Sequence, residues 1–533
     1  MKKIIGGLLC ISLSFSLLSC KKKKSTDKTT TKANTTNIST TTQRQTTSKH
    51  TTTIDIPRDN IDYESNYSPI ISDKLPRIDI VVNDSTIPEE EKMDFVTKPG
   101  LNDEPDYTKC LVTVINESDV VELDAKGAGV KVRGNYTKEY DKKPLRIKFD
   151  KKQAMLGLND DPDNPDDGKY KNWLLLAEYK DWSLERNSTA FYLAHLMSDY
   201  YVTDFRLVEV YINGNYWGVY LLAEQQEVKE GRVDISEYAD DYEGTDIGYF
   251  LEFDGYAYQE PALQQFYVDY KPLYDYTKTQ LFSNFQRGFT IKNDLYSTAQ
   301  RDFIHSYIQN VFDICYYAIY EEKYYSFNST YTSISLDSSL KNSYEAISKV
   351  IDVDSLVNSF LLADITCDTD TAWSSFLMDV DFSENGNKKL TFEAPWDYDS
   401  ALGNTKACVS GEGEFAASIF INAINEETGN PWYMLFYQCD WFMNLVRDKF
   451  NSMKEKGYFT RVLNYINTLS TKYETSFNNN YTKWDNIGHP EKTGWEQNEN
   501  SRKCTTQKQA AEQLHSWLTT RINSLDKVYN KKS

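Results

Sequence analysis

The sequence predicts an α+β fold in which a β-rich first half precedes a mainly helical second half. Between residues 75 and 260, short runs alternate apolar and polar side chains, which is the period of a half-buried strand. Between residues 261 and 529, apolar residues recur at helical spacing over long segments. The chain has 533 residues, of which 40% are hydrophobic, so it can bury a large core. We therefore expect a folded region over 75–529, with a β-rich lobe at 75–260 and a helical lobe at 261–529.

Eight strands are expected in the first half. Within residues 143–149, Leu145, Ile147 and Phe149 share one face and the basic residues share the other. Asn213 and Gly214 predict a type I′ hairpin turn, because both residues accept a positive φ. One helix should begin near Asp181 or Ser183, either of which can cap it. The expected strands are 77–82, 110–115, 129–135, 143–149, 172–177, 207–212, 216–221 and 248–254.

Helical spacing dominates the second half. The expected helices are 299–322, 354–366, 433–456, 459–474 and 507–529, and two short strands, 375–379 and 389–392, interrupt them. In the last helix Leu514, Leu518, Ile522 and Leu525 form an apolar stripe, which favours core packing.

The first 53 residues differ in character from the rest. Residues 1–20 place two lysines before a short apolar run that ends in LLSC, which predicts a signal peptide similar to a bacterial lipoprotein signal. Cleavage before Cys20 and lipidation of its sulfur would follow; an ordinary secretory signal with a chance cysteine is the alternative. Residues 21–53 are rich in Thr, Ser and Lys and predict a disordered tether. We expect an exported, membrane-anchored lipoprotein whose body lies on the extracytoplasmic or cell-surface side.

Charge follows the same division. Residues 1–53 hold ten basic residues and one acidic residue, which leaves 49 basic and 78 acidic residues, a net charge of −29, in the body. An acidic body excludes nucleic acid as an expected partner. An anionic nucleotide remains compatible if a divalent cation bridges it to carboxylates. The cysteines and histidines show no zinc spacing, and one disulfide is compatible with their scatter.

Carboxylates occur at both ends of the predicted 375–392 hairpin. Asp370 precedes its first strand, and Asp397 and Asp399 follow its second strand in the run APWDYDSALGN. A hairpin brings both loops to one end, so these carboxylates can converge. Protein kinases use this order: one Asp for the substrate hydroxyl, a short hairpin, and a second Asp for Mg²⁺. Solvated turns are the alternative interpretation of the same residues.

Together these motifs resemble the CotH kinase family, the spore coat protein H-like group of atypical secreted or surface-bound kinases. The resemblance covers roughly residues 75–529. The residues that carry it are Arg133-Gly134-Asn135, Lys142 to Lys148, Trp173-Leu174-Leu175, Asp181, Arg186-Asn187, Tyr211 to Gly214, Gly218-Val219-Tyr220, Glu224, Asp370, Pro395 to Asp399, Gly403-Asn404, Trp517, Arg521 and Leu525-Asp526.

The resemblance implies a two-lobed, protein-kinase-like fold that binds ATP and Mg²⁺ or Mn²⁺. It places Asp370 as the catalytic aspartate and Asp397 as the metal ligand, with Asp399 as a further ligand or a turn cap. The implied nucleotide-binding residues are Lys148, with Lys143 as a competitor, Glu224 as the partner of that lysine, and Arg133 in a phosphate loop. Kinases place an Asn five residues after the catalytic Asp, where this chain has Ser375, a weaker metal ligand.

The function expected from these residues is a surface-tethered kinase that transfers phosphate from Mg-ATP to a protein acceptor. A kinase-like surface binding or adhesion protein without turnover is the first alternative. A glycan-processing lipoprotein with Asp370 and Asp397 as the acid–base pair is the second.

Overall fold

The structure is a computed structural model, and it describes residues 56, 61–98, 106–159, 168–274, 278, 280, 287–408, 411–412, 429–493 and 497–530. Residues Thr52–Lys532 form one compact unit, separate from Met1–Thr51. The predicted signal peptide, Cys20 and the tether lie outside the described residues. No described helix is long and apolar enough to span a bilayer.

Seven strands close into a barrel. They are β1 (Arg77–Val82), β2 (Thr108–Ile115), β3 (Val121–Val132), β4 (Leu145–Gln153), β5 (Tyr170–Leu176), β6 (Phe205–Ile212) and β7 (Asn215–Glu224). The order is β1-β2-β3-β4-β5-β7-β6, and the barrel closes where β1 pairs in parallel with β6. Alternate side chains such as Ile78, Ile80 and Ile147 are fully buried in its core. The predicted hairpin turn is present, with positive φ at Asn213 and Gly214.

Four further strands form a second sheet, outside the barrel. Its strands are β8 (Gly248–Asp254), β9 (Gln265–Phe266), β10 (Gly288–Ile291) and β13 (Phe376–Asp381), in the order β13-β8-β10-β9. The sheet therefore joins strands from both sides of residue 260, because β13 pairs along the whole of β8. The expected return strand at 389–392 is reduced to single bridges, since Thr391 pairs with Asp379 while Leu390 pairs with Ile351.

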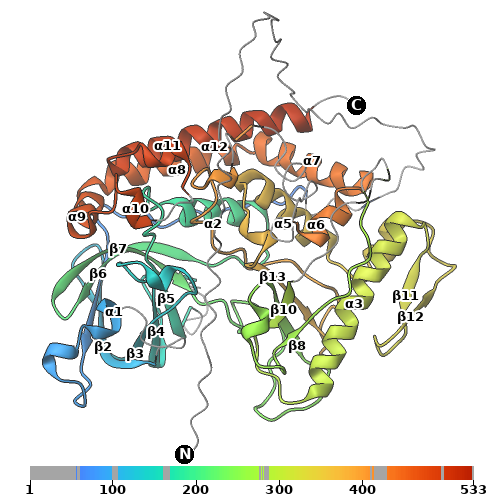
Figure 1. Cartoon of the computed structure of the whole chain (residues 1–533), viewed down its shortest axis with the longest axis horizontal. Coiled ribbons are helices and arrows are strands. Elements are labelled where there is room, and N and C mark those ends of the chain that lie inside the picture. Colours follow the sequence, from blue (N-terminus) through green and yellow to red (C-terminus); the bar gives the residue numbers. More distant parts are fainter. Residues whose placement is uncertain are drawn as a thin grey trace, which may run out of the picture. The chain divides into compact units, whose positions relative to one another are not determined.

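The long helices form a layer beside both sheets (Figure 1). They are α2 (Arg186–Met197), α5 (Val353–Thr366), α7 (Asp440–Glu455), α8 (Tyr458–Lys472) and α12 (Gln507–Tyr529). Helix α3 (Thr298–Tyr320) runs beside the second sheet and begins with a capping box between Ser297 and Gln300. Shorter elements are α1 (Asp94–Thr97), β11 (Tyr325–Phe327), β12 (Ile334–Leu336), α4 (Ser343–Ile347), α6 (Pro431–Phe436), α9 (Glu474–Trp484), α10 (Pro490–Thr493) and α11 (Glu499–Arg502).

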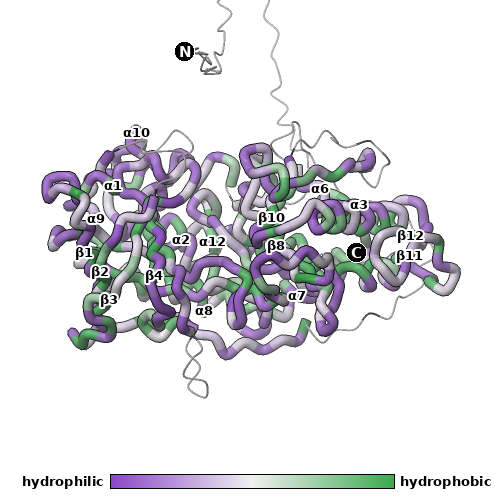
Figure 2. The backbone as a smooth tube through the Cα atoms, turned by 90° about the horizontal axis from the view of Figure 1, so that it is seen from below, coloured by the Kyte–Doolittle hydropathy of each residue, from purple (hydrophilic) through white to green (hydrophobic). Residues whose placement is uncertain are grey.

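The α+β prediction is confirmed, and the element types match at almost every predicted segment. Hydrophobic and hydrophilic residues interleave along the strands and helices (Figure 2), as amphipathic elements around a core require. The apolar stripe of α12 packs in this core, where Leu514, Leu518 and Leu525 are at most 1% exposed. The six cysteines in the described part of the chain are buried and form no disulfide there.

Candidate active-site cleft

A cleft of about 560 Å³ brings together loops from the barrel, the second sheet and the 393–400 segment. Its volume lies within the range of small-molecule sites. Among the polar residues that line it are Arg133, Asn135, Lys142, Glu178, Lys180, Asn187, Glu252, Asp254, Lys292, Asp370, Ser374, Ser375, Asp397, Asp399 and Ser400. The structure therefore gathers five residues expected from the sequence: Asp370, Asp397, Asp399, Ser375 and Arg133.

Asp370 begins a single 3-10 turn, Asp370–Ala372, between α5 and β13. Its Oδ2 accepts a hydrogen bond from the Ser375 hydroxyl at 2.8 Å. Its backbone N–H donates to Asp368 at 3.0 Å, which fixes the turn. Burial raises the pKa of Asp370 to about 6, although Ser375 and Lys180 oppose that shift. A carboxylate with such a pKa is suited to accept a proton near neutral pH.

Ser375, which stands where kinases have an Asn, also makes structural contacts around the Asp370 turn. Besides its bond to Asp370, its backbone N–H donates to Glu252 at 2.9 Å, which ties the Asp370 turn to β8. Its φ is +59°, a left-handed value that is costly for a residue with a side chain. The hydroxyl proton is committed to Asp370, so Ser375 could meet a cation only through the remaining lone pairs of its oxygen.

Asp397 and Asp399 lie on a tight turn held from both sides. Asp397 itself has a φ of +66°. The backbone N–H of Tyr398 donates to Asn187 at 2.7 Å, and the Asn404 amide donates to the Asp399 carbonyl at 2.6 Å. The Lys180 ammonium lies 3.8 Å from an Asp399 oxygen. The turn therefore presents two carboxylates to the cleft in a fixed position.

The aromatic neighbours of this turn are packing residues, as expected. Trp396 and Tyr398 are 8% and 3% exposed. Both rings pack on Phe191 of α2, with centroid distances of 5.7 Å and 6.1 Å. Asn187 stands on the same helix, so α2 anchors the whole turn.

Negative charge in the cleft exceeds what the nearby cations offset. Burial, then Asp399 and Asp370, raise the pKa of Asp397 well above its usual range, while Lys180 and Arg133 oppose the rise. Asp368 lies behind them with a raised pKa and, among the described residues, an Oδ2 without a hydrogen-bond partner. Crowded carboxylates of this kind suit a hard divalent cation.

This donor set fits Mg²⁺ without enclosing it. No group of three or more His, Cys, Asp or Glu side chains in the described ranges is already arranged to hold a metal. Mg²⁺ in nucleotide sites takes one or two carboxylates, with the remaining positions filled by phosphate and water. Asp397 and Asp399 supply that number.

The loop from Arg133 to Asn135 enters the cleft directly after β3. The Arg133 guanidinium lies 5.5 Å from the Trp396 ring; burial lowers its pKa, and Asp397 opposes that shift. Gly134 has a φ of +91°, and a Cβ there would meet the Thr137 hydroxyl at 2.5 Å. The glycine is therefore required by the turn that carries Arg133 and Asn135.

Three other residues that the resemblance predicts for nucleotide binding do not line this cleft: Lys148, Lys143 and Glu224. Lys148 is exposed on the outer face of β4, since its neighbour Ile147 occupies the barrel core. The Lys143 ammonium donates to the carbonyls of Lys138 and Tyr140 instead. Glu224 is fully buried and pairs with Arg232 at 3.3 Å.

The described lysines that line the cleft are Lys142, Lys180 and Lys292, and Lys292 pairs with Glu252 at 2.7 Å. Lys180 follows β5 and contacts Ser400 and Asp399. Lys142 donates to Asn480 at 2.9 Å and to the Val219 carbonyl, and burial lowers its pKa to about 7. Lys180 shortly follows a predicted strand, and this position could have marked it as a cleft residue, because the residues of binding sites are often found where strands end.

Arg186 is structural, as the sequence suggested. It pairs with Asp181, whose carboxylate also accepts the backbone N–H groups of Ser183 and Arg186 at the start of α2. Its neighbour Asn187 instead faces the cleft and donates to Glu178 at 2.9 Å. Glu178 and Glu252 are further cleft residues that sequence reasoning missed.

Comparison with known proteins agrees with this geometry. No curated protein matches the chain. The family described as CotH kinase protein matches residues 130–525, which include every cleft residue named above. The match covers more than half of the chain, and the chain therefore belongs to the CotH kinase family.

Proposed function

We propose that this protein is an atypical kinase with a two-lobed, protein-kinase-like architecture, which transfers a phosphoryl group from Mg-ATP to a hydroxyl of a protein acceptor. The observation that carries the proposal is the meeting of Asp370, Asp397 and Asp399 with Lys180 and Arg133 in one cleft. Family membership supports a kinase-like protein.

The position of each cleft residue suggests its role in the proposed reaction. Asp370, with its pKa of about 6, orients the acceptor hydroxyl and takes its proton. Asp397 and Asp399 hold the divalent cation, which when bound supplies neutralisation of phosphate charge. Lys180 and Arg133 provide fixed positive charge beside those carboxylates. Phosphoryl transfer depends mainly on such positioning and electrostatics.

The decisive experiment measures nucleotide binding and phosphate transfer separately. We expect Asp370→Asn to leave Mg-ATP affinity within about tenfold and to lower transfer by about 10² or more, because the group acts in the transition state. Asp397→Asn should weaken Mg-ATP binding by about tenfold or more and leave metal-free ATP binding unchanged. Asp124→Asn, an exposed carboxylate on β3, is the matched control.

One observation favours a second candidate, a nucleotide-binding scaffold without turnover. The Ser375 hydroxyl donates to Asp370, which stabilises the ionised carboxylate and makes it a poorer base. Wild-type protein that binds Mg-ATP yet labels neither itself nor co-expressed surface proteins would establish the scaffold. Equal Mg-ATP affinity in wild type and Asp397→Asn would remove the metal assignment altogether.

A further inference from the structure

Glu178 lines the cleft, and the roles proposed above for the cleft residues do not include it. It stands two residues after the end of β5 and two residues before Lys180. The residue is only 5% exposed, and its φ of +51° is a left-handed value that costs free energy for a residue with a side chain. Such a conformation persists where the surrounding structure fixes it, so the fold holds Glu178 in the wall of the cleft.

One oxygen of the Glu178 carboxyl is hydrogen-bonded and the other is not. Its Oε1 accepts from the Asn187 amide at 2.9 Å. Its Oε2 is buried and has no hydrogen-bond partner among the described residues. Lys142 affects Glu178 through its charge, but its ammonium donates to Asn480 and to the Val219 carbonyl. A buried oxygen in this state costs free energy unless a ligand or a water molecule supplies a donor.

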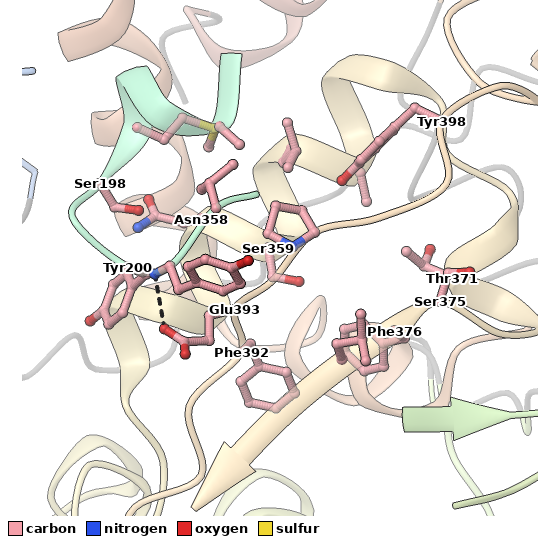
Figure 3. A pocket seen from close by; sticks show the side chains of 18 of the residues that line it. Ser198, Tyr200, Asn358, Ser359, Thr371, Ser375, Phe376, Phe392, Glu393 and Tyr398 are labelled. Atoms are coloured by element: carbon pink, nitrogen blue, oxygen red, sulfur yellow. Dashed lines mark hydrogen bonds between the residues drawn. The ribbon is translucent and has the colours of Figure 1, made fainter. Parts of the chain in front are cut away.

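The small cavity near the cleft does not account for this oxygen. That cavity has a volume of about 50 Å³, and Ser375 lines both it and the cleft. Figure 3 shows Ser375 and Tyr398 among the residues around it. Neither Glu178 nor Asn187 belongs to its lining, whereas both line the cleft. The cleft is therefore the space from which a ligand can reach Glu178.

Asn187 joins Glu178 to the turn that carries the proposed cation ligands. Its amide nitrogen donates to Glu178, and its amide oxygen accepts from the backbone N–H of Tyr398 at 2.7 Å. Tyr398 stands between Asp397 and Asp399 in the chain. Two hydrogen bonds and a single amide group therefore separate the Glu178 carboxyl from this turn, and a ligand whose phosphates meet a cation there can also reach Glu178.

The lining near Glu178 in the chain changes from apolar to charged. Leu176 and Ala177 directly precede it, while Lys180 contacts Asp399. A nucleotide presents the same order of chemistry, with a flat base, a ribose that carries hydroxyl groups, and phosphates. The apolar and aromatic lining residues from the end of β5 and from the 136–144 segment are Tyr136, Tyr140, Pro144, Leu176 and Ala177.

We propose that Glu178 hydrogen-bonds a ribose hydroxyl of the nucleotide, so that the cleft selects ribonucleotides over deoxyribonucleotides. This inference rests on the proposed function, which supplies the nucleotide. Burial and then Asp181 raise the pKa of Glu178 well above its usual range, while Asn187 opposes the rise. A hydroxyl suits either protonation state of the carboxyl, because it both donates and accepts. A phosphate oxygen suits it less well, since an ionised carboxylate repels it.

Titration calorimetry of the full chain with Mg-ATP and its 2′-deoxy and 3′-deoxy analogues tests the proposal without any substitution. We expect at least one analogue to bind the wild type about tenfold more weakly than Mg-ATP, because the buried Glu178 oxygen then loses its partner.

Glu178→Ala should lower the affinity for Mg-ATP by about tenfold and bring the affinities for all three nucleotides to within about twofold of each other. Mg-tripolyphosphate has no ribose, so it should bind this variant within about threefold of the wild type, which also checks the fold. The control Glu139→Gln removes a charge from an exposed residue that does not line the cleft, and it should keep the discrimination of the wild type.

Equal affinity of the wild type for Mg-ATP and both analogues would overturn the inference, whether or not Glu178→Ala folds. Full discrimination in a Glu178→Ala variant that still binds Mg-tripolyphosphate would also overturn it. In both cases the protein binds Mg-ATP and the proposed function stands. A wild type that binds neither Mg-ATP nor Mg-tripolyphosphate would defeat both proposals, so the two failures are distinguishable.

Discussion

At the scale of single residues, the charge inside the cleft depends on which side chains reach it, and not on how many charged residues lie nearby in the sequence. Lys180 and Lys148 both belong to neighbouring parts of the barrel, yet Lys180 contacts Asp399 while Lys148 is exposed beside the Tyr107 ring. The same residue type thus lies beside a cleft carboxylate in one place and in solvent in the other.

Lys180 and Lys148 provide a matched test of whether contact with the cleft carboxylates matters for nucleotide binding. Lys180→Met should lower both Mg-ATP affinity and phosphate transfer by about tenfold or more, because the ammonium is 7% exposed and offsets the Asp397 and Asp399 charges. Lys148→Met should change neither by more than about twofold. Nucleotide titration and a transfer assay on both variants measure this, and a larger effect at Lys148 would reverse the assignment.

His195 predicts a pH dependence of stability. Its ring stacks on Tyr67 at 3.7 Å, and burial lowers its pKa from about 6.5 to about 4. Between these values the unfolded state binds a proton that the native state refuses, so the free energy of unfolding falls as pH falls from about 6.5 to about 4. Urea unfolding at pH 7 and pH 5 should show a smaller loss in His195→Phe than in wild type. An equal loss in both proteins would exclude His195 as the cause.

At the scale of elements, helices α5 and α12 are joined by a buried polar clamp directly before the Asp370 turn. Asp364 accepts from Arg521 at 2.6 Å and from the Tyr529 hydroxyl at 2.6 Å. Three residues later, Cys367 ends α5 with a φ of +50°, and the chain enters the turn of Asp370. The clamp therefore holds the end of α5 from which the Asp370 turn begins.

Breaking this clamp from one side should be costly. Arg521→Met leaves the Asp364 carboxylate buried without its cation, and we expect a loss of about 3–5 kcal/mol in the free energy of unfolding. The double variant Arg521→Met with Asp364→Leu should recover much of that loss, since no charge is then buried. Denaturant unfolding of both variants decides the point, and a double variant less stable than Arg521→Met would contradict it.

At the scale of the whole molecule, the chain combines a compact unit, Thr52–Lys532, with an N-terminal region of opposite charge. We propose that the N-terminal region serves export and membrane attachment through Cys20, which places the kinase-like unit on the extracytoplasmic or cell-surface side. The motif LLSC and the polar composition of residues 21–53 support this proposal.

Two variants test whether the N-terminal region attaches the protein to the membrane while the compact unit folds without it. Cys20→Ala should move the protein from the membrane fraction to the soluble fraction, because lipid attachment supplies the anchor. A truncated protein of residues 54–533 should unfold at the same temperature as the full chain, within about 2 °C, since the compact unit begins at Thr52. Unchanged membrane fractionation of Cys20→Ala would argue against the lipoprotein assignment.

The sequence by itself determined the strand and helix types, the position of the hairpin at Asn213 and Gly214, and the two acidic loops that meet in the cleft. These features depend on local periodicity, turn chemistry and chain order, and residues that are close in sequence determine all three. Asp370 and Asp397 were accessible to this reasoning because each follows or precedes a recognisable strand or helix, whereas Arg133 was predicted only through the resemblance to the CotH kinase family.

Only the tertiary structure decided the closure of the barrel through β1 and β6, the entry of Glu252 and Lys180 into the cleft, and the hydrogen bond that joins Asn187 to the backbone of Tyr398. Each of these depends on pairing between segments far apart in sequence. Alternation shows that Lys148 and Ile147 point to opposite faces of β4, but it does not show which face meets the cleft. That choice follows from how the strands close around the barrel core, where the apolar face of β4 is buried and Lys148 is left in solvent.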